Sequence, residues 1–452
     1  MSAPLLSILV LAAMFILATV LPLNMGALAF VGAFLLGFVF LGMDTDDILA
    51  NFPGELFLTI VGVTYLFAIA QNNGTIDLLV RGAVRLVGNR VALIPWIMFA
   101  ITAAITAVGA LSPAAVAIVA PIALGFAARN NINPLLMGMM VIHGAQAGGF
   151  SPIAVYGVTV NGIIAGTDLE SSPLAVFLAS LLFNTFIAVI LTVLLGGRGR
   201  RGSLAGRFAE QVAAARVNAT ASHPDVPFKG FGSDMYGPRD PAGDGVEATR
   251  EGRVKAPQVL TILGLLALAV IALGFKVDVG FVSITIAVLL ALASPEAQKG
   301  AVNKISWSTV LLICGMLTFV GVLQAAGTVE YVSEGVASLG MPLLAALLIC
   351  YIGAVVSAFA SSTAILAALI PLAVPFLASG EIGAVGLICA LAVSSTIVDV
   401  SPFSTNGALV LANAPENVDK DRFYKQILTY SAVVVVLGPA VAWLVMVVPG
   451  WL

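Results

Sequence analysis

The sequence predicts an all-α integral membrane protein built from two inverted repeats, each with five transmembrane helices and one re-entrant helical hairpin. Of its 452 residues, 60% are hydrophobic and 10% are charged, and the mean hydropathy is +1.08. Soluble domains are only about half apolar. Apolar runs long enough to cross about 30 Å of hydrocarbon recur along the chain, and motifs of the first half recur in the second.

The repeat is visible in residues that recur at a fixed offset of 250 positions. The pairs are Ser112 with Ser362, Pro121 with Pro371, and Ser151-Pro152 with Ser401-Pro402. Chance matches rarely share an offset. We therefore predict a first repeat at 1–196 and a second at 257–452. The segment between them, 197–256, is rich in Gly, Pro, Asp and Arg and is expected to be a soluble linker.

Each half contains three apolar spans, a long interrupted apolar stretch and two further spans. In the first half the spans are expected at 4–22, 25–42, 55–72, 134–164 and 172–196, with the interrupted stretch at 91–128. In the second half they are expected at 257–275, 279–295, 307–326, 383–412 and 426–448, with the interrupted stretch at 342–378. Five crossings is an odd number, so the second half must enter the membrane from the opposite side.

The basic residues support this topology, because cytoplasmic loops carry an excess of Lys and Arg. With the linker inside and both termini outside, all 20 Lys and Arg residues except Lys276 fall on the inner side. We therefore expect a multi-pass protein of the cell inner membrane with a cytoplasmic linker and both termini on the outer side.

The two interrupted stretches could each be a hairpin or a pair of full spans, because both give the same parity. Residues 91–128 divide at 109–113, which we call the inner tip, into arms near or below spanning length. The inner tip is also too apolar for a water-exposed loop. We expect a hairpin entering from the cytoplasm here and an opposite one at 342–378, with its outer tip at 360–363.

Irregular backbone at membrane depth is tolerated where protein buries it or where it lines a watery cavity, so the two tips predict a binding site near the midplane. The following spans are also interrupted, at 143–152 and 393–402. Freed helix N-termini favour an anion, whereas freed carbonyls and hydroxyls suit sodium. No Lys or Arg lies within the expected spans. A bound anion would thus be balanced by dipoles, by cations or by a protonated histidine.

Several polar residues are candidates for this site. The repeated serines are Ser112, Ser151, Ser362 and Ser401, and Asn161 and Asn406 follow the two interruptions. Asp399 is the only carboxylate placed deep in a span, where it acts either in cation binding or proton coupling or as a structural hydrogen-bond acceptor. His143 is either a substrate or proton ligand or a packing residue.

Other classes of protein receive no support from the sequence. The three cysteines lack metal-ligand spacing, and nothing points to nucleic-acid binding. The spans contain no paired aspartates, no Ser-Lys pair and no histidine cluster, so an intramembrane enzyme is not expected. A channel remains an alternative, distinguished by currents that need no coupling gradient.

The tips and interruptions resemble a known superfamily. Ser361-Ser362-Thr363 looks like an outer hairpin tip, Ala110-Leu111-Ser112-Pro113 like an inner one, and the two Ser-Pro pairs like Thr-Pro positions. The arrangement is similar to the ion-transporter superfamily that includes the divalent-anion/sodium symporters, and most closely to the MatC-type dicarboxylate (malonate) carriers. Those symporters carry Ser-Asn-Thr at each tip; here Asn is missing from both, and a proline follows Ser112.

The resemblance implies a secondary active transporter that imports a small dicarboxylate such as malonate together with sodium, working as an elevator and as a homodimer in membrane lipid. A proton-coupled or exchange carrier for another small anion is the alternative. The implied substrate ligands are Ser112, Ser151, Ser361, Ser362, Thr363, Ser401, Asn406 and His143. The implied sodium ligands are Ser112, Gly149, Ser151, Ser362, Asp399 and Ser401.

Overall fold

The structure is a computed structural model in which all regular elements of the described residues are helical. These residues are 2–21, 23–76, 78–79, 82, 91–167, 169–196, 255–275, 277–328, 331, 341–358, 362–378, 382–415 and 418–450. Within them there is no β-strand, which confirms the predicted all-α class. The expected linker lies almost wholly outside the described residues, as does Ser361.

The first half of the chain forms helices that follow the expected spans closely. In chain order these are α1 (Ala3–Val20), α2 (Met25–Phe34), η1 (Leu35–Phe40), α3 (Thr45–Leu49), α4 (Gly54–Asn72), η2 (Val91–Leu93), α6 (Ile94–Ala107), α7 (Ser112–Asn130), α8 (Pro134–Gly149), α9 (Val155–Ala165) and α10 (Pro173–Leu195). The interrupted stretch is thus two helices, α6 and α7, and the following span is also two, α8 and α9.

The second half repeats this order. It contains α12 (Ala256–Gly274), α13 (Val279–Ala293), α14 (Pro295–Gln298), η4 (Val302–Lys304), α15 (Trp307–Ala325), α17 (Pro342–Ser357), α18 (Ser362–Ala378), α19 (Ala384–Ile397), η5 (Val398–Val400), α20 (Thr405–Ala412) and α21 (Lys420–Met446). The last helix extends beyond the expected span at 426–448 and begins at Lys420. Asp419 caps the helix by accepting hydrogen bonds from the backbone N–H groups of Asp421 and Arg422, so α21 includes a polar first turn.

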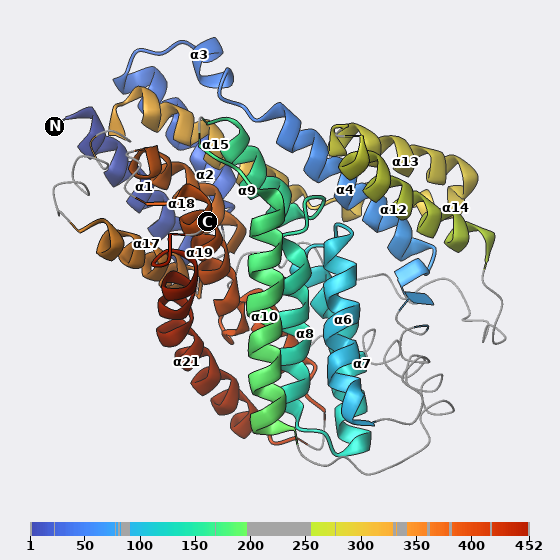
Figure 1. Cartoon of the computed structure of the whole chain (residues 1–452). Helices are drawn as coiled ribbons and strands as arrows, with labels where there is room; N and C mark the ends of the chain where they lie inside the picture. The colour runs from blue at the N-terminus through green and yellow to red at the C-terminus, as the bar shows by residue number, and fades with distance from the viewer. Residues whose placement is uncertain are drawn as a thin grey trace.

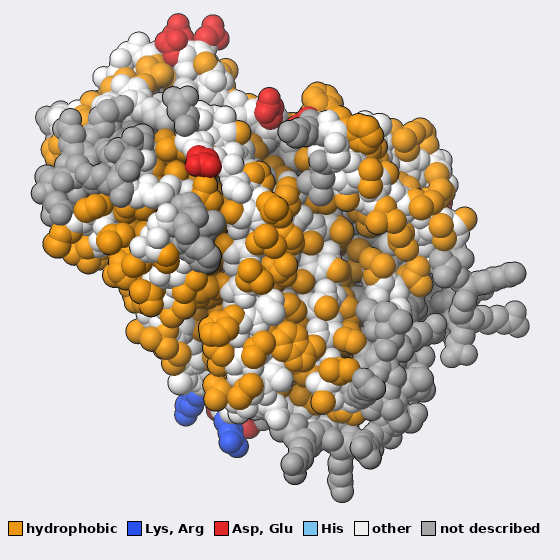
Figure 2. Space-filling model, viewed as in Figure 1, with side chains coloured by type: hydrophobic (Ala, Val, Ile, Leu, Met, Phe, Trp, Pro, Cys, Tyr) orange, Lys and Arg blue, Asp and Glu red, His pale blue; other side chains and the backbone are white. Residues whose placement is uncertain are grey.

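The surface of the molecule is suited to a membrane. Six of the described helices are long and apolar enough to cross one. The outward face of α10 exposes Leu182, Phe186 and Val193, and Val193 is 77% exposed. Figure 2 shows hydrophobic side chains over most of the visible side. Acidic side chains gather at the end near α3, and basic side chains lie at the opposite end, where α21 begins (Figures 1 and 2).

The two halves interlock through close helix crossings that occur twice. Helix α2 crosses α15 where Gly26 meets Gly315: a Cβ on Gly315 would lie 2.1 Å from the Gly26 carbonyl oxygen. Helix α13 crosses α4 where Gly280 meets Gly62, and a Cβ on Gly62 would lie 2.8 Å from the Gly280 carbonyl oxygen. Small residues allow helix backbones to approach closely in membranes. In the first crossing the second helix of the first half packs on α15 of the second half, and in the second crossing α13 of the second half packs on α4 of the first.

The remaining helices show the same exchange. Helix α7 of the first half contacts α20 of the second, and α18 of the second half contacts α9 of the first. Similarly α10 contacts α19, and α21 contacts α8. Figure 1 shows α6, α8 and α10 side by side below the group formed by α4, α12 and α13. The interrupted helices of both halves are therefore brought together in the interior.

Candidate functional site

Both interrupted spans break with the same local geometry. In the first break, residues 150–154, the N–H of Ser151 donates to the Gly148 carbonyl at 3.0 Å and that of Ala154 to the Ser151 carbonyl at 2.8 Å. In the second break, residues 401–404, the equivalent bonds run from Ser401 to Val398 at 2.9 Å and from Ser404 to Ser401 at 3.0 Å. The repeated Ser-Pro pairs thus end one helix and start the next in both halves.

A glycine follows each break for a steric reason. A Cβ on Gly157 would lie 2.0 Å from the Ser151 carbonyl oxygen, and a Cβ on Gly407 would lie 2.0 Å from the Ser401 carbonyl oxygen. No side chain fits there, because real Cβ contacts are not shorter than about 3 Å. Both glycines are 250 positions apart, so the repeat extends beyond the Ser-Pro pairs into the start of the following helices.

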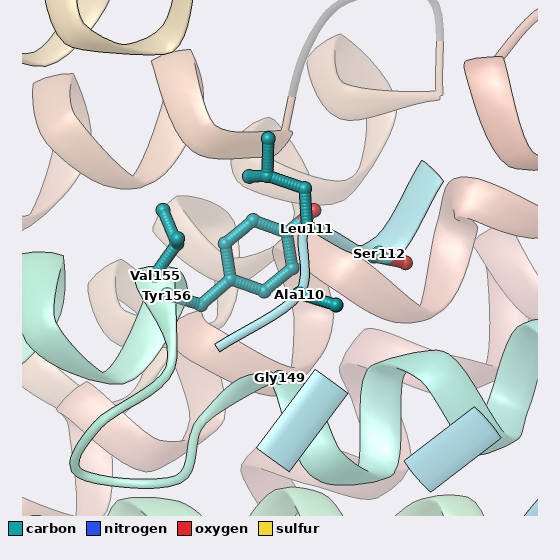
Figure 3. A pocket seen from close by; sticks show the side chains of 6 residues that line it. All are labelled: Ala110, Leu111, Ser112, Gly149, Val155 and Tyr156. Carbon is teal, nitrogen blue, oxygen red and sulfur yellow. The ribbon is translucent and has the colours of Figure 1, made fainter. Parts of the chain in front are cut away.

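The inner tip lies against the first break. Gly109 turns the chain with φ +113°, a conformation that other residues rarely adopt. Beyond it, Ala110, Leu111 and Ser112 line a narrow pocket with Gly149, Val155 and Tyr156. Figure 3 shows the Tyr156 ring lying against the tip segment. The pocket is narrow in this conformation, with the tip and the break close together.

Side chains join each tip to the interrupted helix of the opposite half. Asn406 at the start of α20 donates from Nδ2 to the Ser112 hydroxyl at 2.8 Å. Tyr156 at the start of α9 lies close to the side chain of Thr363 at the start of α18. Tyr156 and Asn406 are 250 positions apart, as are Ser112 and Ser362. The two contacts correspond with the halves exchanged, except that Tyr156 contacts Thr363, one residue beyond the equivalent of Ser112.

Asp399 lies beside the outer tip. The Ser362 hydroxyl donates to its Oδ1 at 2.5 Å, and the Ser362 oxygen is also 2.8 Å from the Ser357 oxygen. Ser357 in turn donates to the Ser395 carbonyl at 2.6 Å. Ser404 donates to the Asp399 backbone carbonyl. The carboxylate is thus tied to the outer tip by α17, α18 and η5 together.

The electrostatic character of the site follows from what is buried there. Across the described ranges, Asp399 is the only Asp, Glu, Lys or Arg side chain that is buried. Helices α7 and α9 begin here without a side-chain cap, so their N–H groups and positive dipole ends are available to an anion. Hydroxyl, carbonyl and carboxylate oxygens of the breaks and the outer tip are hard ligands suited to a sodium ion.

The structure does not bring His143 to this cluster. Its Nδ1 is 2.8 Å from Oδ1 of Asn184 on α10, and its Nε2 is 2.6 Å from the Tyr430 hydroxyl on α21. The Asn184 amide donates to the Ser180 carbonyl at 2.9 Å, so Asn184 accepts from Nδ1–H and Nε2 accepts from Tyr430. Both ring nitrogens of this fully buried histidine already have protein partners, which matches a packing role.

The other predicted residues take different places. Ser112, Gly149, Ser362, Thr363, Asp399 and Asn406 form one continuous cluster. Ser151 and Ser401 lie in the breaks, where the Ser401 hydroxyl accepts from the Phe403 N–H at 3.2 Å. Asn161 is half-buried on α9. Ser361 lies outside the described residues.

Sequence reasoning missed Tyr156, Ser357 and Ser404. Tyr156 could have been found, because it occupies the position 250 residues before Asn406 and precedes a glycine in the same way. Its chemistry differs from that of asparagine, so a comparison of residue types does not reveal the pair.

An all-helical membrane protein that encloses a polar cluster between interrupted helices is typical of secondary transporters. Residues 1–149 of this chain match the family model described as the dicarboxylate carrier protein MatC N-terminus. The match covers roughly a third of the chain, from α1 to the end of α8, and it supports a transporter of the MatC type rather than an enzyme. No curated protein sequence matches the chain.

Among solved structures, the chain is similar to the YdaH transporter of Alcanivorax borkumensis, whose description reports an unusual topology. The two share 15% sequence identity, and the match covers 88% of each chain with a TM-score of 0.49.

Proposed function

We propose that the chain is a secondary carrier that imports a small dicarboxylate, such as malonate, together with sodium ions. The observation that carries this proposal is the cross-half cluster. Ser112 with Asn406 and Thr363 with Tyr156 link both tips to both interrupted helices, next to a buried carboxylate and two uncapped helix N-termini. Such a site can hold an anion and cations together without a basic side chain.

The exchanged contacts between the halves support two inverted repeats as the basis of the carrier. The inner tip reaches only as far as the first break, so α6 and α7 act as a re-entrant hairpin, and α17 and α18 act as its counterpart. In this proposal the linker is cytoplasmic, both termini lie outside, and the protein resides in the cell inner membrane. The basic side chains at the end where α21 begins agree with this placement.

A division of labour follows from the same arrangement. The helices that carry the cluster, α6 to α10 and α17 to α21, form the moving part. The interlocked helices α1 to α4 and α12 to α15 form a scaffold that also joins two copies into a homodimer. In this proposal, access to the narrow pocket at the inner tip involves separation of the tip from the break.

Two groups of residues are suited to the coupling ions. The first contains Ser112, Gly149 and Ser151 and offers hydroxyl and carbonyl oxygens alone. The second contains Ser362, Asp399 and Ser401 and adds a carboxylate. Since Gly149 and Asp399 are equivalent positions 250 residues apart, the two ion sites differ by one full negative charge.

Proton coupling is the second candidate, and the Asp399 environment favours it specifically. A single buried carboxylate that accepts a hydrogen bond from a movable tip can carry a proton between the two sides. In that case protonation of Asp399 would change its hydrogen bond with Ser362 and so affect the hairpin.

Transport in proteoliposomes separates the two. Purified protein is reconstituted, and uptake of labelled malonate is measured with an inward sodium gradient or with an inward proton gradient, each alone. Uptake that requires sodium supports the first candidate, and uptake that follows pH and ignores sodium replaces it by the second. Competition by unlabelled succinate, malate and monocarboxylates then defines the substrate. If malonate is not taken up and none of these dicarboxylates competes, both candidates are refuted.

A further inference from the structure

Gln146 on α8 is fully buried, and neither polar atom of its side-chain amide has a hydrogen-bond partner. Buried polar groups in folded proteins are nearly always paired, since leaving them unpaired costs free energy. The equivalent residue of the second half, Thr396, satisfies its hydroxyl by donating to the Ala392 carbonyl at 2.9 Å. At this position of the repeat only the first half has an unpaired group, and Gln146 is the residue in which both polar atoms of an amide lack a partner among the described residues.

The direction of Gln146 follows from its helix. Gly144 and Gly148 face α6. A Cβ on Gly144 would lie 2.4 Å from the Phe99 carbonyl oxygen, and a Cβ on Gly148 would lie 2.0 Å from the Ala103 carbonyl oxygen. Successive residues of an α-helix are about 100° apart, so Gln146, two residues from each glycine, points away from α6. Its amide is not part of the contact between α6 and α8.

Two further contacts of α8 narrow the direction. Gly138 faces α20, since a Cβ on Gly138 would lie 2.5 Å from a methyl carbon of Val410. His143 faces α10 and α21. By the same arithmetic Gln146 points between them, about 80° from Gly138 and about 60° from His143. Helix α8 also contacts η5 and α19, and η5 carries Asp399. The free amide thus faces the crossing of the two interrupted helices, one turn before α8 ends at Gly149.

We propose that Gln146 is a ligand of the transported dicarboxylate and donates a hydrogen bond from Nε2 to one of its carboxylate groups, an inference that rests on the proposed function. A neutral amide suits this role, because it offers two donors to an anion without adding a fixed positive charge to the membrane interior. Gln146 is then the first-half complement to Asn406, whose Oδ1 is also buried without a partner.

Equilibrium binding of labelled malonate to the purified full-length protein tests this. Gln146→Met keeps the side-chain length and removes the donor, and it is expected to weaken malonate binding by about 10-fold to 100-fold. Gln146→Glu keeps the shape but lacks the donor when ionised, so its binding should be poorer at neutral pH and recover as the new carboxyl group is protonated. Thr102→Val is the control, since Thr102 is equally buried and its hydroxyl is bonded within α6.

The thermal unfolding midpoint without malonate is measured for each variant to separate binding from folding. Wild-type malonate affinity in Gln146→Met overturns the inference, and so does a lowered unfolding midpoint with unchanged affinity. If Gln146→Met does not fold, a loss in Gln146→Glu that is independent of pH overturns it. Absence of any dicarboxylate binding by the unchanged protein overturns the proposed function, and the inference with it, whereas the first two outcomes leave the proposed function intact.

Discussion

Asp399 and Ser362 are joined by a direct hydrogen bond in a setting where no other buried side chain carries a charge among the residues described. We expect that replacing either one changes the site and leaves the fold largely intact. Asp399→Asn keeps the shape and removes the charge, so we expect the dependence of malonate uptake on the coupling cation to weaken. The concentration of cation that gives half-maximal uptake measures this, with the exposed Asp46→Asn as control.

Ser362→Ala removes the hydroxyl that bonds Asp399 and Ser357. Hydrogen bonds to charged groups contribute about 1.5–3 kcal/mol, so we expect the KM for malonate to rise about 10-fold or more. Ser283→Ala is the control, because this buried hydroxyl bonds only within α13. A KM for malonate equal to that of the wild type in Ser362→Ala would show that the outer tip is not part of the binding site.

His143 tests the opposite case, a buried polar residue outside the cluster. His143→Ala leaves Asn184 and Tyr430 without their shared partner, and we expect the midpoint of thermal unfolding in detergent to fall by a few degrees. Malonate KM should stay unchanged. Tyr430→Phe removes one of the two hydrogen bonds and should show a smaller fall. A stable His143→Ala protein with a strongly raised KM contradicts this assignment.

The candidate site could be predicted from sequence where the repeat preserved position and chemistry, or where a polar residue such as Asp399 stood out in an apolar span. Ser112 and Ser362 were visible for that reason. Tyr156 was not, because its equivalent is an asparagine, and Gln146 was not, because its equivalent is a threonine with a satisfied hydroxyl. The role of His143 depends on partners 41 and 287 positions away, which no local pattern indicates.

At the scale of single elements, the inner tip depends on one glycine. Gly109 has φ +113°, and a Cβ there would lie 2.3 Å from a methyl carbon of Val63 on α4. We expect Gly109→Ala to cost at least about 1 kcal/mol from the backbone alone, and to lower both the unfolding midpoint and the rate of malonate uptake.

A second substitution separates the two causes. Combining Gly109→Ala with Val63→Ala relieves the overlap but not the backbone strain, so the double variant should recover only part of the loss. Gly54→Ala is the control, because nothing lies within 4 Å of an added Cβ there. Full activity in Gly109→Ala would show that the inner tip adapts freely.

The helices themselves could be predicted well, since apolar length and helix-ending residues are local signals. The breaks at the inner tip and at the two Ser-Pro pairs were placed correctly. Helix α21 begins before the expected span at 426–448 because its first two turns carry Lys420, Arg422 and Lys425, which an apolar run does not include. The Asp419 cap is the signal that marks the true start.

At the scale of the whole molecule, two equivalent loops test the orientation of the halves. Helix α3 lies between α2 and α4, and α14 lies between α13 and α15. If the repeats are inverted, Asp46→Cys reacts with a membrane-impermeant maleimide from outside, and Glu296→Cys reacts only after the membrane is opened. The native cysteines, Cys314, Cys350 and Cys389, are all buried, so background labelling should be low. Labelling of both variants from one side would contradict inversion.

The buried carboxylate of Asp399 also has an electrical consequence. A carrier whose site returns empty takes this carboxylate with it, and one elementary charge moved across the full membrane potential corresponds to about 2.3 kcal/mol per 100 mV. The return step should therefore be accelerated or slowed by voltage according to the direction of travel, whereas the charge of the loaded site depends on how many cations accompany the dianion. Electrophysiological recording of the return step would then reveal the ionisation state of a single side chain.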